Sequence, residues 1–374
     1  MKIDVIGPTF PTKGGISHYN TLMCENLAKS HQVNCYSFKR MYIKWLYPGV
    51  CETDEQSKSQ IRTSTNRIVD SVNPLSWIRT FNRIRKDKAD LVIIPWWTSW
   101  LSHVFISIAL MTKLFTKSKV LFLCHNVIPH KREPMDRPLA KITFSLGDYF
   151  ITHSKQDRDD LVSIKKKANV KVGVHPTYEV FNQKPLDKEE VKKEMGIRND
   201  AILFFGYVKP YKGLSYLVEA MPEILKGRDV TLLIVGEFWS PTKEEVLSRA
   251  KELGISDKIK IVDSYVPNEE VGKYYCASDV VVLPYVSATS SGIVQTAFGF
   301  NIPVIVTNTG GLPEVVIDGK TGYIVPTENS TELAKSVLRY YREKDSVDFS
   351  KNIEEDKKRF EWSRMVELIE SFMK

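Results

Sequence analysis

Residues 283–322 read LPYVSATSSGIVQTAFGFNIPVIVTNTGGLPEVVIDGKTG, and this stretch decides how the rest of the chain is interpreted. The run that leads into it, 279–284 (DVVVLP), is apolar and β-branched, as a strand buried in a parallel sheet should be. A loop of small hydroxyl residues follows, then a short helix, a second strand and a glycine-rich turn. The pattern therefore predicts a strand–helix–strand unit of an α/β domain.

The start of the predicted helix carries residues that favour helix initiation, namely Ser287, Thr289, Ser290, Ser291 and Gly292. A helix N-terminus presents unpaired N–H groups and the positive end of the helix dipole, so it attracts anions. No acidic residue lies between Asp279 and Glu314, so nothing in this stretch repels a phosphate. An ordinary capped helix has the same local pattern, and this alternative stays open at this point.

The composition indicates a globular protein of about two domains, since the chain has 374 residues, 43% of them hydrophobic and 26% charged. The 5 cysteines are scattered and lack CxxC spacing, which favours reduced thiols over a disulfide framework or a zinc site. The start, MKIDVIGPTF, reads as a strand and not as a signal peptide. The longest apolar run, 104–114, is too short to span a bilayer. We therefore expect a soluble, cytoplasmic protein.

The net charge of +8 is unevenly placed along the chain. Residues 1–180 carry 27 Lys and Arg against 15 Asp and Glu, whereas the remainder carries 26 against 30. A basic half favours anionic partners such as a nucleotide or a membrane surface. The chain has no zinc-finger spacing, RNP-like strand motif or heptad pattern, which argues against nucleic acid.

The first half begins with a strand at 2–6, a loop that ends in Gly14 and Gly15, and a helix from residue 16. The glycine pair would let the backbone approach a phosphate closely, although the loop is not GxGxxG and gives little support to a dinucleotide site. Further along, a buried strand at 120–124 ends at His125. Ligands of open α/β sheets bind at the carboxyl ends of strands, which favours a functional over a structural histidine.

Residues 39–88 read as mostly irregular up to a basic amphipathic helix near their end. Aromatic residues stand in this segment and beyond it, including Trp45, Trp96, Trp97 and Trp100. They either pack into the domain or form a docking surface for a membrane or a lipid-bearing acceptor.

The second half repeats the alternation of strand and helix, so each half is expected to be a doubly wound parallel sheet. After a strand at 201–205, Lys209 and Lys212 flank a turn just before a helix. Two ammonium groups and a helix dipole would neutralise a diphosphate, whereas solvated lysines in a turn are the alternative. Glu237 follows the strand at 230–235 and lies at a strand end in the same way. The cleft between the two domains is the expected site.

This pattern resembles the retaining glycosyltransferases of family 4, which have the GT-B fold. The resemblance extends over most of the chain and is carried by the glycine pair, His125, FFGYVKPYKGLSYLVEA, Val266-Pro267, 283–326 and the helix entered by Phe360-Glu-Trp362. It implies two Rossmann-like domains that face each other across a cleft. Their expected bounds are 1–180 on the acceptor side and 181–354 on the nucleotide-sugar side, and a C-terminal helix, 355–374, returns to the first domain.

The resemblance also implies transfer of a sugar from a nucleoside-diphosphate donor with retention at the anomeric carbon and without a required metal or other cofactor. Lys209 and Lys212 match the basic pair on the diphosphate, and His125 matches the histidine near the donor sugar; these three are the expected catalytic residues. The remaining donor-binding positions that it implies are Gly14 and Gly15 at a phosphate, Gly292 and Ile293 through their backbone amides, and Val266 at the base.

The chain departs from the family pattern where two glutamates usually stand eight residues apart. These positions fall at Thr289 and at Thr296 or Ala297, none of them acidic. Thr289 is then expected to bind the sugar and Gln295 or Thr296 the ribose, with Ser290, Ser291 and Glu237 completing the donor site. The departure indicates a subgroup and bears on the identity of the donor.

The expected function is thus sugar transfer from a UDP-sugar, in preference to a GDP-sugar, to a saccharide acceptor that is lipid-linked, in polysaccharide or glycoconjugate assembly. Peripheral contact with the inner face of the membrane is part of this expectation. Two alternatives stay open: a catalytically silent nucleotide-sugar-binding partner subunit, which the missing glutamates favour, and a nucleotide-sugar epimerase.

Overall fold

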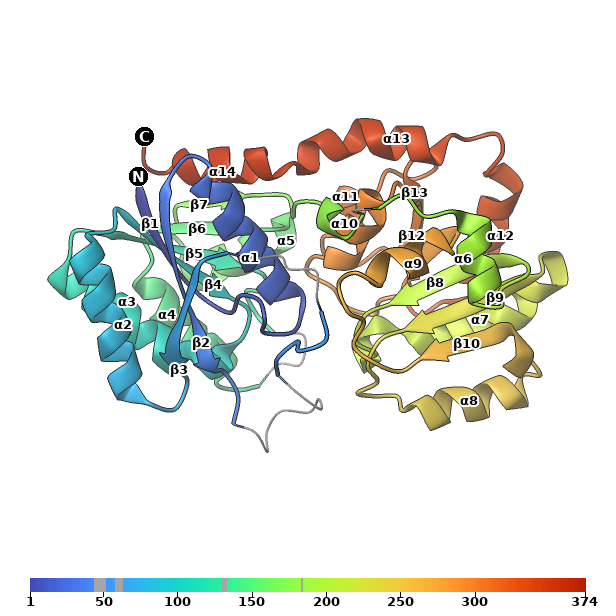
Figure 1. Cartoon of the computed structure of the whole chain (residues 1–374), viewed down its shortest axis with the longest axis horizontal. Helices are drawn as coiled ribbons and strands as arrows, with labels where there is room; N and C mark the ends of the chain where they lie inside the picture. The colour runs from blue at the N-terminus through green and yellow to red at the C-terminus, as the bar shows by residue number, and fades with distance from the viewer. Residues whose placement is uncertain (44–51, 58–62, 130–132, 183) are drawn as a thin grey trace. The chain divides into compact units, whose positions relative to one another are not determined.

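A computed structural model describes residues 1–43, 52–57, 63–129, 133–182 and 184–374 (Figure 1). The chain forms two compact units. Unit 1 comprises Met1–Gln56, Gln60–Val174 and Trp362–Lys374, and unit 2 comprises Ser57–Ser59 and His175–Glu361. The boundaries between these units lie after Val174 and after Glu361, six residues before and seven residues after the expected positions at residues 180 and 354. In the described ranges no helix combines the length and the apolar character needed to cross a bilayer.

Unit 1 contains a parallel sheet of 7 strands in the order β3-β2-β1-β4-β5-β6-β7. The strands are β1 Lys2–Ile6, β2 Gln32–Arg40, β3 Thr65–Asp70, β4 Leu91–Trp96, β5 Lys119–Cys124, β6 Tyr149–Thr152 and β7 Val170–Val172. The helices are α1 Gly15–Ala28, α2 Pro74–Asp87, α3 Ser102–Phe115, α4 Asp136–Ser145, α5 Lys155–Ile164 and α14 Trp362–Glu370. The central strands β4 and β5 are apolar almost throughout and buried, as strands covered on both faces must be.

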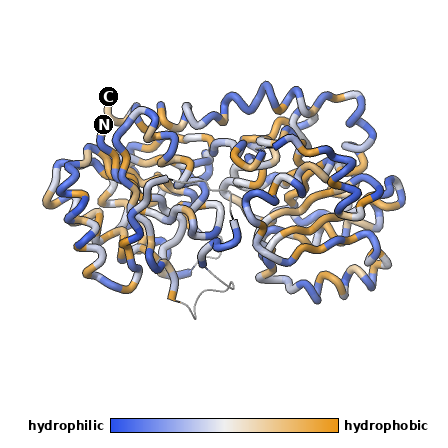
Figure 2. The backbone as a smooth tube through the Cα atoms, in the orientation of Figure 1, coloured by the Kyte–Doolittle hydropathy of each residue, from blue (hydrophilic) through white to orange (hydrophobic). Residues whose placement is uncertain are grey.

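Unit 2 contains a parallel sheet of 6 strands in the order β10-β9-β8-β11-β12-β13. The strands are β8 Asp200–Phe205, β9 Val230–Val235, β10 Ile259–Val262, β11 Val280–Leu283, β12 Val304–Thr307 and β13 Gly322–Val325. The helices are α6 Lys188–Glu194, α7 Leu214–Gly227, α8 Lys243–Glu252, α9 Val271–Cys276, α10 Gly292–Gly299, α11 Leu312–Val315, α12 Ser330–Glu343 and α13 Phe349–Asp356. Figure 2 shows the strands of both sheets as mostly hydrophobic segments.

Both units confirm the expected doubly wound parallel sheets, and in each the strand order reverses between two central neighbours. In unit 1 these neighbours are β1 and β4, and in unit 2 they are β8 and β11. Loops that leave such neighbours diverge to opposite faces of the sheet and open a crevice at the carboxyl edge. The loops that hold Gly14, Lys209 and Ser291 all leave these reversal strands.

Several elements were not expected from the sequence. Residues 39–88 were read as mostly irregular, but they contain β3, whose sequence TNRIVD has only two apolar residues. This strand forms because it pairs in parallel with the edge of β2, from Cys35 beside Thr65 onward. Four further elements were not expected, namely the short helices α4, α5 and α13 and the strand β13. None of them is long enough to show a clear periodic pattern of apolar residues.

The last helix, α14, belongs to the core of unit 1. Its buried Met365 and Ile369 lie in one hydrophobic cluster with Tyr19 and Leu27 of α1. A Cβ atom added to Gly173, which follows β7, would lie 2.6 Å from the Leu368 side chain, so the sheet edge and the helix approach closely. Unit 1 therefore needs residues from both ends of the chain to complete its core.

We expect Ile369→Ala to destabilise unit 1 by about 2–5 kcal/mol, because it removes a fully buried side chain and leaves a cavity. Hydrogen exchange should show faster exchange at the amides of the unit 1 strands, with little change in unit 2. Glu367→Ala on the exposed side of α14 is the matched control, since its ion pair with Arg364 is solvent-exposed. Equal effects of both variants would contradict this role for α14.

Candidate functional site

Two lysines at the carboxyl end of β8 are the most unusual charged groups in unit 2. Lys212 is only 8% exposed and Lys209 is half-buried. Burial lowers the pKa of Lys209 to about 8. Burial, and then the neighbouring Lys209, lower the pKa of Lys212 to about 7. Among the described residues no carboxylate lies within ion-pair distance of either ammonium group. Two desolvated cations without a counter-ion form a site for an anion.

The loop that carries these lysines lies against the loop that follows β11. A Cβ atom added to Gly206 would lie 3.0 Å from Lys212 Nζ and 3.3 Å from Ile293 Cδ1. Gly213 has a φ of +62° and a Cβ there would lie 2.0 Å from the Pro284 carbonyl oxygen, so only glycine fits. The structure thus brings Lys212 together with the start of α10, as the sequence predicted for an anion site.

The N-terminus of α10 has no capping hydrogen bond from its N-cap residue, Ser291. The first backbone N–H groups of the helix, at Gly292 and Ile293, therefore keep their capacity to donate to an anion. Gly292 lies against Tyr178, whose ring would be 3.2 Å from a Cβ added there. Tyr178 was not expected at this site, because it is distant in sequence and lies outside regular structure.

The polar residues that stand where the family has glutamates have mixed roles. The Thr296 hydroxyl donates to the Gly292 carbonyl at 2.8 Å, so its proton is used within the helix. The Gln295 side chain is buried, and its Oε1 has no hydrogen-bond partner among the described residues. Thr289 and Ser290 are half-buried in the loop before the helix. A hydroxyl or amide group is thus present near each position where the family has a glutamate, but none of these groups carries a negative charge.

Glu237 acts on the lysine loop through Trp239. Trp239 Nε1 donates to Glu237 Oε1 at 3.3 Å, and Lys209 Nζ lies 3.9 Å from the centroid of the Trp239 ring. The loops after β8 and β9 are also joined by backbone, since Val208 N donates to Glu237 O at 2.9 Å and Val208 O accepts from Trp239 N at 3.0 Å. Trp239 therefore holds the Lys209 ammonium group without neutralising it. Its role could not be recognised from the sequence, because it depends on this contact between loops.

Tyr207 and Tyr265 complete an aromatic group around Trp239, with ring centroids 4.9 Å apart for Tyr207 and Trp239 and 6.4 Å apart for Tyr207 and Tyr265. Val266, which was expected to meet a base through its backbone, directly follows Tyr265 and has a buried side chain.

Unit 1 holds a separate group of aromatic and histidine rings at the carboxyl ends of β5 and β6. His125 is buried, and its ring centroid lies 4.7 Å from that of Tyr19 and 5.2 Å from that of His153. His153 Nδ1 lies 2.8 Å from the Gly173 carbonyl oxygen, and burial lowers the pKa of His153 to about 4. Trp362 of α14 packs on Tyr19 at 5.1 Å. His125 was expected at this site, whereas His153, which also follows the end of a strand, was not.

The glycine pair of unit 1 lies where β1 passes into α1. Gly14 is the N-cap of α1 with a φ of 105°, and Gly15 is its first residue. A Cβ atom added to Gly15 would meet no atom within 4 Å, so the space above this helix N-terminus is open.

The expected aromatic docking surface is only partly present. Trp45 and Tyr47 lie outside the described residues. Trp96 is fully buried, because it is the last residue of the central strand β4 and packs on Phe105 and Phe144; its assignment to an exposed surface was wrong. Trp97 is half-buried and Trp100 is exposed.

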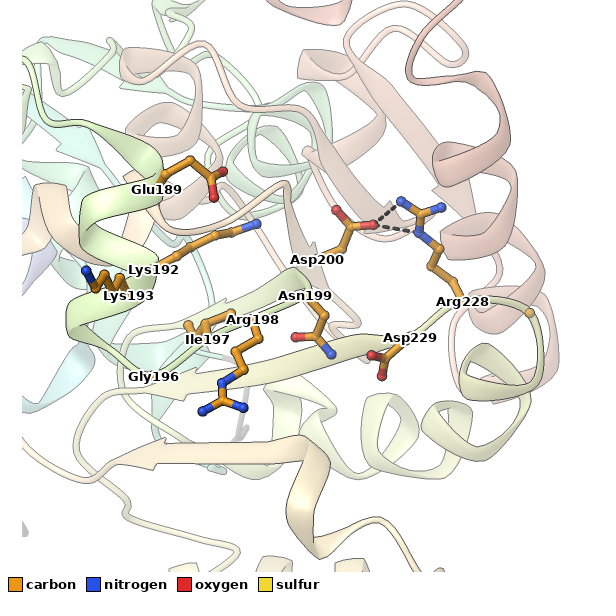
Figure 3. A pocket seen from close by; sticks show the side chains of 11 residues that line it. Glu189, Lys192, Lys193, Gly196, Ile197, Arg198, Asn199, Asp200, Arg228 and Asp229 are labelled. Carbon is orange, nitrogen blue, oxygen red and sulfur yellow. Dashed lines mark hydrogen bonds and ion pairs between the residues drawn. The ribbon is translucent and has the colours of Figure 1, made fainter.

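A hollow of about 1090 Å³ lies in unit 2 at the amino ends of β8 and β9, away from the lysine loop (Figure 3). Its charged side chains are largely paired: Arg228 with Asp200 at 2.5 Å, and Lys192 with Asp279 at 3.6 Å. Lys193 and Arg198 also line the hollow, but both are solvent-exposed, so the hollow lacks the desolvated charge that marks the lysine pair. Among the described residues no group of three His, Cys, Asp or Glu side chains is placed to hold a metal ion.

Comparison with known proteins finds similarity to glycosyltransferases over part of the chain. Residues 199–343 match the family described as glycosyl transferases group 1. The chain is 31% identical over 225 residues to a D-inositol 3-phosphate glycosyltransferase of Mycobacteroides abscessus, over 58% of this chain and 49% of that one. It is 29% identical over 196 residues to an uncharacterized glycosyltransferase of Methanocaldococcus jannaschii, over 50% of each. The chain thus spans about half the length of these relatives.

Solved structures share the whole fold. The sucrose-phosphate synthase of Thermosynechococcus elongatus superimposes with a TM-score of 0.76 at 18% identity, covering 100% of this chain and 98% of that one. Anabaena HepE in complex with UDP gives a TM-score of 0.76 at 16% identity, covering 100% and 99%. The chain therefore has the GT-B fold, and residues 199–343 have the sequence character of group 1 glycosyl transferases.

The low pKa of Lys212 predicts an unusual stability effect for Lys212→Met. Between about pH 7 and the ordinary lysine pKa of 10.5 the unfolded chain binds a proton at this position that the folded protein does not, so the contribution of Lys212 to the free energy of unfolding rises with pH. Below about pH 7 the buried charge is a constant cost. Lys212→Met should therefore stabilise the ligand-free protein at pH 6, by on the order of 3 kcal/mol, and less so toward pH 10.

Denaturation at several pH values checks this, with the exposed Lys226→Met on α7 as the control. A Lys212→Met protein less stable than the wild type at pH 6 would show that the lysine has a counter-charge in the folded state.

We also expect Trp239→Leu to weaken the binding of pyrophosphate, the minimal diphosphate, by about 3- to 30-fold, because Lys209 loses the ring that holds it. Trp239→Phe keeps an aromatic face and should lose less. Isothermal titration calorimetry measures the difference, and equal losses in both variants would mean that packing and not the cation–π contact matters.

Proposed function

We propose that the protein is a retaining, metal-independent glycosyltransferase that uses a nucleoside-diphosphate sugar, a UDP-sugar in preference to a GDP-sugar. The acceptor we propose is a lipid-linked saccharide in polysaccharide or glycoconjugate assembly at the cytoplasmic face of the membrane. One observation carries the proposal: Lys209 and Lys212 are desolvated, have no counter-ion in the described residues, and lie beside the uncapped N-terminus of α10. A diphosphate supplies the charge that this arrangement lacks.

In the proposed reaction the bond between the anomeric carbon and the phosphate oxygen breaks while an acceptor hydroxyl oxygen bonds to the same face of that carbon. Negative charge develops on the leaving diphosphate, where the two ammonium groups and the backbone N–H groups of Gly292 and Ile293 stabilise it. The leaving phosphate oxygen takes the proton of the acceptor hydroxyl, so no protein base is required. The charge that a metal ion supplies in other enzymes comes here from the lysines.

We assign His125 to orienting the donor sugar and Gly14 and Gly15 to backbone contact with the phosphates. The ring of His125 is fixed by Tyr19 and His153, which suits a residue that positions a ligand. Thr289, Ser290 and Ser291 would bind the sugar or phosphate, and Gln295 and Thr296 the ribose. Glu237 acts through Trp239, and Val266 meets the base through its backbone.

Support for a uridine donor comes from the structural neighbour, since Anabaena HepE is described in complexes with UDP and with UDP-glucose. Support for sugar transfer comes from relatives named D-inositol 3-phosphate glycosyltransferases, whose names do not bear on the lipid-linked acceptor. These names concern those proteins, and the acceptor of this chain is part of the proposal.

A second candidate is a catalytically silent nucleotide-sugar-binding subunit. It is favoured by the absence of acidic residues at Thr289 and Thr296. It would bind a nucleotide sugar at the same lysines but would transfer nothing.

Thermal unfolding with a panel of nucleotides and nucleotide sugars tests the proposal. A ligand that binds the folded state raises the melting temperature, and we expect the largest shift with UDP or a UDP-sugar. Lys212→Met should abolish the shift although it stabilises the ligand-free protein, so the two effects have opposite signs. Binding should also weaken above about pH 7, because Lys212 must take up a proton to meet the diphosphate.

The donor found in this way is then incubated with lipid-linked acceptors in the presence of a chelator, and NMR of the product reports the anomeric configuration. A shift without hydrolysis or transfer would support the silent subunit. No shift with any nucleotide would overturn the proposed site.

A further inference from the structure

We infer that unit 1 docks on an anionic lipid bilayer through the outer face of α2 and α3. We call this surface the α2–α3 face and define it by Leu75, Ile78, Arg79, Leu110, Leu114 and Phe115. The inference rests on the proposed lipid-linked acceptor for its purpose, while its structural basis is independent of the nucleotide site.

The two helices are neighbours on one side of the unit 1 sheet, as Figure 1 shows. The rings of Phe81 and Phe115 lie 5.9 Å apart, and the His103 ring packs on Trp77 at 5.4 Å, so α2 contacts α3 near both ends of α3. Their outer sides therefore form one continuous surface.

Exposed apolar side chains are concentrated on this surface. Leu75 is 70% exposed, Leu114 65% and Phe115 63%. Five of the 14 large hydrophobic side chains that are exposed in the described residues lie on these two helices, namely Leu75, Ile78, Leu110, Leu114 and Phe115. The outward stripe of a surface helix is ordinarily polar, since its inner stripe already supplies the contact with the core. In the described part of unit 1, this outer apolar stripe remains largely exposed, although Phe115 also packs on Phe81.

The positions follow helical geometry. Leu75, Ile78 and Arg79 lie three and four residues apart on α2, and Leu110 and Leu114 lie four apart on α3. Each set therefore points to one side of its helix. Both helices bury the opposite side, through Ile84 on α2 and Ile108 on α3 among others.

The charge of the same segment is strongly positive. Residues 72–119 contain 8 basic side chains and 2 acidic ones, and Asp87 of these two is hydrogen-bonded to the Tyr36 hydroxyl. Arg79, Arg83 and Lys86 are exposed on α2 beside the apolar residues. Lys113 is the one described cation on α3, and it pairs with Asp148 at 2.7 Å. The surface thus offers protruding aliphatic and aromatic groups within a positive field.

This mixture fits a bilayer better than a protein partner. The central part of a protein interface is depleted of charged residues other than arginine, whereas on α2 two arginines and a lysine stand together among the apolar residues. A bilayer with anionic headgroups accepts both, because the cations stay among the phosphates while the apolar groups enter the acyl boundary. Lys and Arg also extend their charged ends toward headgroups while their stems cover apolar surface.

Sedimentation with vesicles of phosphatidylcholine, with and without phosphatidylglycerol, tests the inference. The wild-type protein should bind the vesicles that contain phosphatidylglycerol and bind pure phosphatidylcholine far less. Two triple variants should each lower the partition coefficient at least about tenfold. The first removes apolar side chains and is Leu75→Ser/Ile78→Ser/Leu114→Ser. The second removes positive charges and is Arg79→Ser/Arg83→Ser/Lys86→Ser.

The control is Leu247→Ser/Ile317→Ser in unit 2, which removes two apolar side chains of 41% and 40% exposure and should leave vesicle binding unchanged. Circular dichroism and the melting temperature establish that each variant is folded. If the triple variant is not, the single variants Leu75→Ser and Leu114→Ser replace it, and each should lower binding severalfold.

No binding of the wild type to anionic vesicles, or an equal loss in the control, would overturn the inference. Unchanged vesicle binding together with a change from dimer to monomer in light scattering would show instead that a second copy covers the face. The thermal shift with nucleotide, measured on the same variants, separates this test from the proposed function. If only the docking inference is wrong, the thermal shift with nucleotide is still observed. If only the proposed nucleotide site is wrong, no thermal shift appears and binding to vesicles is still observed.

Discussion

The burial of two ammonium groups, with no carboxylate of the described residues to balance them, is the constraint on which the second unit depends. Burying two charges without a counter-ion costs free energy, so the surrounding backbone must hold the two lysines in place. Gly213 permits contact with the Pro284 carbonyl, and Gly206 leaves room for Lys212 Nζ. Trp239 then holds Lys209 from the next loop. Three loops that are separated in sequence are therefore needed to maintain one cationic site.

The two sheets hold the loops rigidly, and this keeps the two ammonium groups in their buried positions despite the cost of burying them. The loops leave β8, β9 and β11, which are adjacent strands at or next to the point where the strand order reverses. The strands are buried and apolar, so their side chains fix where each loop starts. Unit 1 uses the same principle for its ring cluster, since His125 and His153 follow the paired strands β5 and β6. The positions of these lysines and histidines are thus determined more by the pairing of the strands than by the conformation of the loops.

Sequence alone predicted the parts of the site that depend on local order. Lys209, Lys212 and His125 each follow an apolar strand, and the carboxyl end of a strand can be recognised from the residues before it. Tyr178 and Trp239 could not be predicted in this way, because each acts through a contact between loops. The burial of Trp96 was not predicted, because an aromatic residue that follows an apolar run can be the last buried residue of a strand or lie beyond the strand in an exposed loop. β3 needed its partner β2 to be recognised.

The packing of α14 on α1 also has a consequence for biosynthesis. A ribosome releases the strands of unit 1 first, but Met365 and Ile369, which complete their core, emerge only after all of unit 2 has been made. Until then the apolar side of α1 and the sheet edge at Gly173 lack their cover. Unit 2, which is contiguous apart from a few residues, can fold while it is being synthesised. The order of folding would then be the reverse of the order of synthesis, and the nascent first unit is the stage most exposed to aggregation and to chaperones.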